Sequence, residues 1–399
     1  MEDISKLDTI NVGIVGHIDH GKTTLLQRLS GKWADTHSEE LKRGITIKLG
    51  YADAIIYDED GKLTVDKNSK GKQKRYVTFV DAPGHEMLMA TMLSGAAIMD
   101  AAILVVAANE GIKPQTSEHL VALKAKNIKN IIIVQNKIDL VSKEKAIANY
   151  HAIKEFVKGT VAENATIIPV SATQGINLDK ILEELCKIEI KKPVDSEMPI
   201  FLVARSFDIN KPGTEIQNLH GGILGGALKQ GKLKVGDTIE IKPGYSYKKQ
   251  NQYCYKSVQS KIISMQKGEH KITEAFPGGS LAIETELDPA LTKADSLSGG
   301  VASKENLLPE ISDKITMKFN LFKEVFGTGK HEPVGEIKSN EMLMLSLNTS
   351  ITVGQVLSAK PESIELSLKI PVVPLKGESI GIARNFNGHW RLIGFGEII

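Results

Sequence analysis

Residues 16–23 have the composition and spacing of a loop that binds phosphate groups. They read GHIDHGKT, which fits the pattern G-x-x-x-x-G-K-[ST], and they lie between an apolar run and a helix-like segment. Glycines allow backbone N–H groups to surround phosphates, Lys22 can neutralise the β- and γ-phosphates, and the Thr23 hydroxyl can bind Mg²⁺. Alone, this pattern predicts a nucleoside triphosphate site, with a chance match in a Gly-rich turn as the alternative.

A second group of residues could sense the γ-phosphate. The segment DAPGH begins at Asp81, directly after the apolar run Tyr76–Val80. The Asp81 carboxylate can hold the Mg²⁺ shell, Gly84 leaves room for its N–H beside the γ-phosphate, and His85 can position the attacking water. Thr46, in the segment RGIT, is the candidate switch residue whose hydroxyl completes the Mg²⁺ shell. Without these motifs, we would interpret Thr46 as an ordinary strand residue and His85 as an exposed loop residue.

Two further motifs select the base. NKID at 136–139 follows another apolar run, and a carboxylate at Asp139 can accept hydrogen bonds from N1–H and the 2-amino group of guanine, which adenine lacks. Ser171-Ala172 follows the last apolar run and is placed to close over the base. Ligands of an open α/β sheet bind at the carboxyl ends of its strands. The motifs in this order therefore predict a P-loop GTPase.

The prediction for the whole site can be stated residue by residue. His85 is assigned to catalysis, and the nucleotide contacts are assigned to Asp19, His20, Gly21, Lys22, Thr23, Thr24, Gly84, Asn136, Lys137, Asp139, Ser171 and Ala172. The metal contacts are assigned to Thr23, Thr46, Asp81, Asp19 and Gly44. Asp19 lies inside the phosphate loop, so its carboxylate either faces solvent or binds a second cation. A transition-metal cluster at His17, Asp19 and His20 is disfavoured, because these residues share the turn that surrounds the phosphates.

The first 196 residues alternate apolar β-branched runs with helix-like segments, which predicts a mostly parallel sheet covered on both faces. The expected strands are Ile10–Val15, Tyr76–Val80, Ala102–Val106, Ile131–Val134 and Ile167–Val170, and the expected helices are Thr23–Leu29, Glu86–Gly95, Thr116–Lys126, Ser142–Lys158 and Leu178–Ile188. Residues 58–75 are polar, contain no obvious core position and are expected to form a solvated hairpin or loop.

The second half has a different pattern. Segments such as Lys234–Lys242 and Ser363–Ile370 alternate apolar and polar residues, and 10 of the 14 prolines lie beyond residue 196. This pattern is typical of antiparallel β structure. We therefore expect a G domain at 1–196, a β-barrel domain II at 197–310 and a β-barrel domain III at 311–399.

Composition excludes several classes of protein. The chain has 399 residues, 41% hydrophobic and 25% charged, which excludes disordered and collagen-like chains and suits two or three domains. Fifty basic and 48 acidic residues leave a net charge of +2, so nucleic-acid binding would depend on local patches. Two cysteines, no signal-peptide pattern and no long apolar segment lead us to expect a cytoplasmic protein.

The motifs resemble those of the translational GTPases, and the resemblance covers the whole chain. It is carried by GHIDHGKTTL (16–25), LKRGITIKLGY (41–51), DAPGHEMLMATMLSGAAIMDAAILVVAANE (81–110) and RSFDINKPGTEIQNLHGGILGGALKQGKLKVGD (205–237). HEMLMATM at 85–92 and LDPALTKAD at 287–295 are more similar to the gamma subunits of archaeal translation initiation factor 2 than to elongation factors of the Tu type.

This resemblance implies a G domain followed by two β-barrels, with GTP hydrolysed to GDP in the presence of Mg²⁺. It also implies binding of methionylated initiator tRNA, assembly with alpha and beta subunits, and delivery to the small ribosomal subunit. Archaeal members commonly carry a four-cysteine zinc knuckle ahead of the Asp-x-x-Gly motif. Residues 56–75 contain no cysteine, so no zinc is expected here.

Two other functions remain open from the sequence. One is a different tRNA-carrying GTPase, such as an elongation factor or a selenocysteine-specific factor. The other is a GTP-switched assembly platform that binds tRNA weakly without its partner subunits. The charged tRNA that the protein protects, with and without those subunits, distinguishes these functions.

Overall fold

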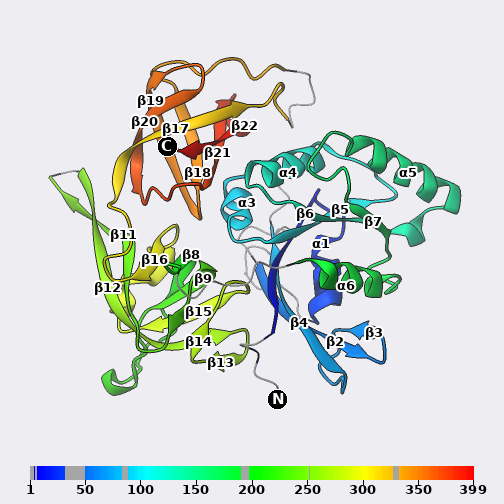
Figure 1. Ribbon diagram of the computed structural model, residues 1–399, viewed down its shortest axis with the longest axis horizontal. Coiled ribbons are helices and arrows are strands. Elements are labelled where there is room, and N and C mark those ends of the chain that lie inside the picture. Colours follow the sequence, from blue (N-terminus) through cyan, green and yellow to red (C-terminus); the bar gives the residue numbers. More distant parts are fainter. Residues whose placement is uncertain are drawn as a thin grey trace. The chain divides into compact units, whose positions relative to one another are not determined.

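A computed structural model describes residue 4 and residues 7–31, 50–82, 89–189, 197–250, 252–326 and 332–399. Among these residues, no helix is long and apolar enough to cross a membrane. The described chain forms an α/β part followed by two antiparallel β parts (Figure 1).

The α/β part is built on a mixed sheet with the strand order β3-β2-β4-β1-β5-β6-β7. Its strands are β1 Thr9–Gly16, β2 Gly50–Glu59, β3 Lys62–Thr64, β4 Lys72–Asp81, β5 Ala101–Ala107, β6 Asn130–Asn136 and β7 Thr166–Pro169. Its helices are α1 Lys22–Ser30, α3 Met89–Ala96, α4 Pro114–Ala125, α5 Lys143–Phe156 and α6 Leu178–Lys187. Strand β1 pairs in parallel with β4 on one side and β5 on the other, and these three strands place the phosphate loop at the centre of the sheet's carboxyl edge.

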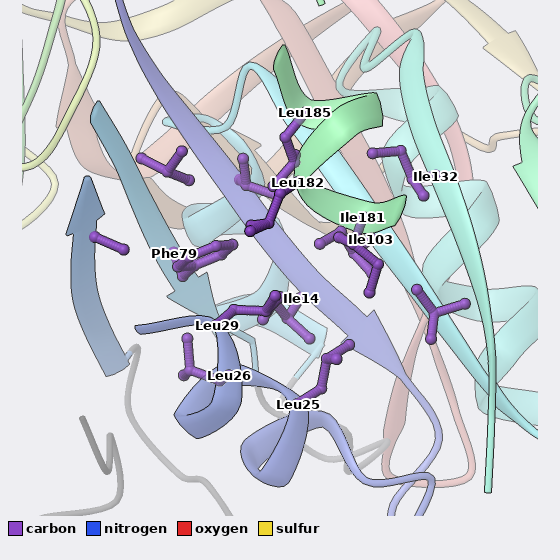
Figure 2. Close-up of a cluster of buried hydrophobic side chains, with 14 of the residues drawn as sticks. Ile14, Leu25, Leu26, Leu29, Phe79, Ile103, Ile132, Ile181, Leu182 and Leu185 are labelled. Atoms are coloured by element: carbon purple, nitrogen blue, oxygen red, sulfur yellow. The ribbon is translucent and has the colours of Figure 1, made fainter. Parts of the chain in front are cut away.

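The core on one face of this sheet fixes the start of α1. Alternate β1 residues such as Ile14 point to this face, where Leu25 and Leu29 of α1 and Leu182 of α6 cover them, all nearly inaccessible to solvent. Figure 2 shows the side chains of α1 and α6 meeting those of the central strands. Burying a leucine of this kind contributes about 1.5–3 kcal/mol, so the core holds the helix that begins at the phosphate loop.

The predicted strands and helices are confirmed where the structure describes them, and residues 86–88 of the expected helix Glu86–Gly95 lie outside the described residues. The expectation for residues 58–75 was wrong in part. Strands β2 and β3 run antiparallel to their neighbours and continue the sheet beyond β4. Leu63 and Val65 pack against the buried cluster. The guanidinium of Arg75 is buried and donates a hydrogen bond to the Leu185 carbonyl oxygen. This segment therefore supplies an edge of the core, because the partly buried Leu63 and Val65 are isolated among polar residues and form no apolar run.

The second part is an antiparallel sheet closed by pairing of β11 with β12. Its strands are β8 Ile200–Phe207, β9 Ile223–Gln230, β10 Leu233–Lys234, β11 Thr238–Lys249, β12 Gln252–Lys267, β13 His270–Ile272, β14 Glu274–Ala275, β15 Leu281–Thr285 and β16 Val301–Lys304. Leu233, Ile239 and Ile241 lie in its buried core. The alternating segment Lys234–Lys242 contributes to two strands, β10 and β11, which are separated by a turn in which Gly236 has φ +92°.

The third part is a closed antiparallel barrel with the strand order β17-β20-β19-β18-β21-β22. The strands are β17 Ser312–Leu321, β18 Met342–Leu347, β19 Ser350–Ala359, β20 Ser363–Val372, β21 Ser379–Phe386 and β22 His389–Ile398. Alternating positions such as Ile364, Leu366 and Leu368 are buried, as the sequence pattern predicts. The fold class, a mostly parallel GTPase sheet followed by two β-barrels, is confirmed, and the domain boundaries remain predictions.

Candidate functional site

The phosphate loop connects β1 to α1 through backbone conformations that favour glycine. Gly16 and Gly21 have φ values of +139° and +89°. A Cβ atom on Gly21 would lie 2.4 Å from the Nδ2 atom of Asn136, so a side chain at this position is excluded by space as well as by strain. The loop therefore presents backbone at the start of α1, where the helix dipole and unpaired N–H groups favour an anion.

Lys22 is held at the centre of this loop. Its Nζ atom donates hydrogen bonds of 2.9 Å each to the carbonyl oxygens of Gly16 and His17. The side chain is buried, so its positive charge lies against the backbone turn and not in bulk solvent. A buried ammonium group in a loop of N–H donors attracts phosphate oxygens strongly, because charge-assisted hydrogen bonds are about twice as strong as neutral ones.

The side-chain oxygen atoms of Thr23 and Asp81 lie close together beside the loop. The Thr23 hydroxyl donates to the Oδ2 atom of Asp81 at 3.3 Å, which joins the start of α1 to the end of β4. Asp81 is fully buried. Hydroxyl and carboxylate oxygens are the hard donors that Mg²⁺ prefers, and Mg²⁺ in nucleotide sites commonly takes one or two protein ligands besides phosphate oxygens. The donor set therefore fits a magnesium–nucleotide complex.

Asn136 connects the phosphate loop to the loop that follows β7. Its Nδ2 atom donates to the His20 carbonyl oxygen at 2.9 Å, and its Oδ1 atom accepts from the Ala172 N–H at 3.1 Å. Both bonds are buried. The predicted base-contacting residue Asp139 lies in a short 3₁₀ helix, Ile138–Leu140, and is exposed. Asn136 thus has a bracing role in addition to its place in the base-recognition motif.

The remaining predicted residues at this edge are placed as follows. Ser171 is buried, and its Oγ atom accepts from the Gln174 N–H at 3.2 Å, which shapes the loop that Ala172 begins. Lys137 has φ +61° and places its Nζ atom 3.6 Å from the Oε1 atom of Glu110. Thr24 is half-buried on the first turn of α1.

Asp19 is exposed with φ +61°, a placement that is compatible with both expected alternatives, a carboxylate in solvent or one that binds a second cation. Among the residues that the structure describes, no group of three His, Cys, Asp or Glu side chains is arranged to hold a metal ion. The other predicted residues, Gly44, Thr46, Gly84 and His85, lie outside the described residues.

A residue that belongs to none of the sequence motifs lies behind the phosphate loop. His119 projects from α4, and its Nδ1 atom accepts a 2.7 Å hydrogen bond from the N–H of Gly16. Burial lowers the pKa of His119 to about 3, and a ring that accepts at Nδ1 carries its proton on Nε2. Burial likewise lowers the pKa of His20 to about 4, and its ring centroid lies 5.0 Å from that of His17. A single histidine on a helical segment gives no sequence signal of this role.

We expect His119→Leu to weaken GDP binding and lower stability, whereas His119→Asn retains most of both. Leucine leaves the Gly16 N–H buried without an acceptor, at a cost of about 1–3 kcal/mol, and the Asn amide oxygen can replace Nδ1. Fluorescent-GDP dissociation and thermal unfolding of the three proteins measure this. Equal dissociation rates for the Leu and Asn variants would contradict it.

The same residue predicts a pH dependence of stability. The folded-state pKa of His119 lies below the ordinary value of 6.5, so the unfolded chain binds its proton first as the pH falls. The stability that neutral His119 supports is present above pH 6.5 and is lost progressively as the pH falls toward 3. Urea unfolding from pH 7.5 to pH 5 should show a steeper loss of unfolding free energy in the parent than in His119→Asn.

Comparison with known families agrees with the architecture. Residues 7–190 match the family described as the elongation factor Tu GTP binding domain. Residues 313–398 match the family described as initiation factor eIF2 gamma, C terminal. These matches cover the α/β part and the last barrel.

Solved structures with similar folds are also translation factors. A bacterial selenocysteine-specific elongation factor EF-Sec aligns with a TM-score of 0.76 and 25% identity, over 98% of this chain and 58% of that one. Elongation factor SelB from Methanococcus maripaludis, in complex with the GTP analogue GPPNHP, aligns with a TM-score of 0.72 and 24% identity, over 98% of this chain and 79% of that one.

Curated relatives align along the full length. The translation initiation factor 2 subunit gamma of Methanococcus vannielii is 51% identical over 99% of both chains. The proteins of the same name from Methanosarcina mazei and Thermococcus onnurineus are 50% and 48% identical, over 98% of this chain and 93% and 97% of theirs. With the guanine motif and the phosphate loop at one edge of the sheet, these matches show that the chain belongs to the translation initiation factor 2 subunit gamma family and is a translational GTPase.

Proposed function

We propose that this protein, in its GTP-bound state, binds methionylated initiator tRNA and delivers it to the small ribosomal subunit. It would act in the cytoplasm as part of a heterotrimer with alpha and beta subunits, and GTP hydrolysis would release the tRNA. The observation that carries the proposal is that Gly16, Asp81 and Asn136 lie together at the carboxyl ends of strands β1, β4 and β6. The chain is also about half identical to initiation factor gamma subunits.

In this proposal, Mg²⁺ is bound with the nucleotide by Thr23 and Asp81, with Thr46 added when the γ-phosphate is present. The cation would supply charge neutralisation at the phosphates. Lys22 binds the phosphates, Asp139 selects guanine, and Gly84 reports the γ-phosphate. Asp19 and Gly44 would hold a second cation, which the exposure of Asp19 leaves sterically open. No zinc takes part.

The tRNA proposal predicts tighter binding of methionylated initiator tRNA with GTP than with GDP. Coupling between two sites of this kind typically changes affinity about 5- to 150-fold. Thr46→Ala should reduce the difference, because the switch residue no longer senses the γ-phosphate. Hydrolysis-protection assays with alpha and beta subunits present measure the affinities, with deacylated tRNA as the weaker-binding control.

Each outcome of that assay separates the candidate functions. Hydrolysis-protection curves that coincide for GTP and GDP would contradict tRNA delivery and favour the assembly-platform function. Stronger protection of an elongator or selenocysteinyl tRNA would assign it to another tRNA-carrying GTPase. The structural likeness to EF-Sec keeps the second outcome in the test, because that protein has a similar fold at 25% identity.

His85→Ala should leave GTP binding unchanged and slow ribosome-stimulated hydrolysis by about a hundredfold or more. A residue that positions the attacking water contributes in the transition state and little to nucleotide binding. Single-turnover GTP hydrolysis with ribosomal subunits measures the rate, and His151→Ala, at an exposed position on α5, is the control. A stimulated rate equal to that of the parent would remove His85 from the mechanism.

A further inference from the structure

A two-stranded ribbon extends from the second β part beyond the strands that close it. Strand β16 pairs with β11 only as far as Lys242, and β15 pairs with β12 between Ile262 and Gln266. From Tyr245 to Lys256, β11 and β12 pair with each other alone among the described residues. Figure 1 shows this ribbon projecting from its sheet. We refer to residues 245–250 and 252–256 as the tyrosine ribbon.

The tyrosine ribbon concentrates aromatic and basic side chains. It contains four of the chain's eight tyrosines and no acidic residue. Its basic residues are Lys248, Lys249 and Lys256, and none of them forms an ion pair within the described part of the chain. The ribbon's charge of +3 exceeds the +2 of the whole chain, so it is a local positive surface on a nearly neutral protein.

The pairing register arranges these side chains on both faces. Tyr245 lies opposite Lys256 and Tyr247 opposite Cys254, so both tyrosines share one face. Their ring centroids are 5.9 Å apart. On the other face, Lys248 lies opposite Tyr253, with its Nζ atom 5.2 Å from the ring centroid. Each face therefore carries tyrosine rings beside a lysine.

The rings of Tyr247 and Tyr253 present an aromatic surface to solvent, whereas Tyr245 packs against the barrel core. Tyr247 is 41% exposed and Tyr253 is 63% exposed. The barrel end of β11 is different, because Ile239 and Ile241 are fully buried. The exposed rings of Tyr247 and Tyr253 do not contribute to the core. A ligand that matches this surface carries both flat rings and negative charges. Unpaired RNA nucleotides have both, because bases stack on tyrosine and phosphates meet lysine.

We propose that the tyrosine ribbon binds unpaired RNA that passes around its edge, with one base stacked on Tyr247 on one face, another on Tyr253 on the opposite face, and phosphates at Lys248, Lys249 and Lys256. The contact is independent of GTP, since the ribbon is built from β11 and β12 alone. It goes beyond the proposed delivery of initiator tRNA and does not depend on it.

The test uses the full chain in its GDP state and a short fluorescein-labelled oligoadenylate, with affinity measured by fluorescence anisotropy at several salt concentrations. Tyr247→Ala and Tyr253→Ala should each weaken binding about tenfold, and Tyr247→Phe should bind like the parent because the ring remains. Replacing Lys248, Lys249 and Lys256 by Gln should lower the slope of log affinity against log salt by about 2.

A matched control replaces three exposed lysines of α5, Lys143, Lys145 and Lys154, by Gln. This variant should keep the affinity and the salt slope of the parent. The proposal is overturned if the ribbon variants bind the oligonucleotide as the parent does, or if the α5 variant loses affinity equally. It is also overturned if polyglutamate binds with the same dependence on the two tyrosines, since the ligand would then be an acidic peptide. Unchanged thermal unfolding of Tyr247→Ala separates lost contact from lost fold.

Discussion

Asp139→Asn should weaken GTP binding by about 30- to 1,000-fold and improve binding of xanthosine triphosphate. The loss of a bidentate, charge-assisted contact costs on the order of 2–4 kcal/mol. Asparagine exchanges an acceptor for a donor, which matches the 2-carbonyl group of xanthine. Asp139 is exposed on its 3₁₀ helix, so the substitution changes no packing.

Competition of unlabelled GTP and xanthosine triphosphate against fluorescent GDP and its xanthosine analogue measures this change in specificity. Asp179→Asn, on the exposed start of α6, is the matched control and should retain guanine specificity. GTP affinity in Asp139→Asn equal to that of the parent would remove Asp139 from base recognition.

Asn136→Ala should destabilise the α/β part and weaken the binding of every nucleotide. The side chain joins the His20 carbonyl oxygen to the Ala172 N–H in buried hydrogen bonds of 2.9 and 3.1 Å. Removing it leaves two buried polar groups without this partner, which costs about 2–5 kcal/mol together. The phosphate loop and the loop after β7 then lose their connection, so GDP affinity should fall in parallel with stability.

Thermal unfolding with and without excess GDP, combined with GDP dissociation rates, separates the two effects. Asn130→Ala, at the opposite end of β6, is the control, since its Nδ2 atom makes only an exposed 3.4 Å hydrogen bond to the Asp100 carbonyl oxygen. If Asn136→Ala has the stability of the parent and loses affinity for guanine nucleotides alone, Asn136 contacts the base directly and does not act by linking the two loops.

Much of the fold follows from local sequence patterns. The runs that became β5 and β6, Ala102–Val106 and Ile131–Val134, consist of consecutive apolar residues, which is typical of strands buried on both faces. The phosphate loop is equally local, since Gly16, Gly21 and Lys22 act within one turn. Alternation in the second half predicted β-barrels because side chains on successive strand positions point to opposite faces.

The sequence by itself therefore determined the fold class, the order of the nucleotide motifs and the strands that carry them. The tertiary structure decided which distant residues support those motifs. Asn136 meets His20 across 116 residues, and His119 meets Gly16 across 103. It also packed the partly buried Leu63 against the core, although the sequence around it is polar. Periodicity and motif spacing reflect the backbone over a few residues, whereas these contacts depend on the order in which strands assemble into the sheet.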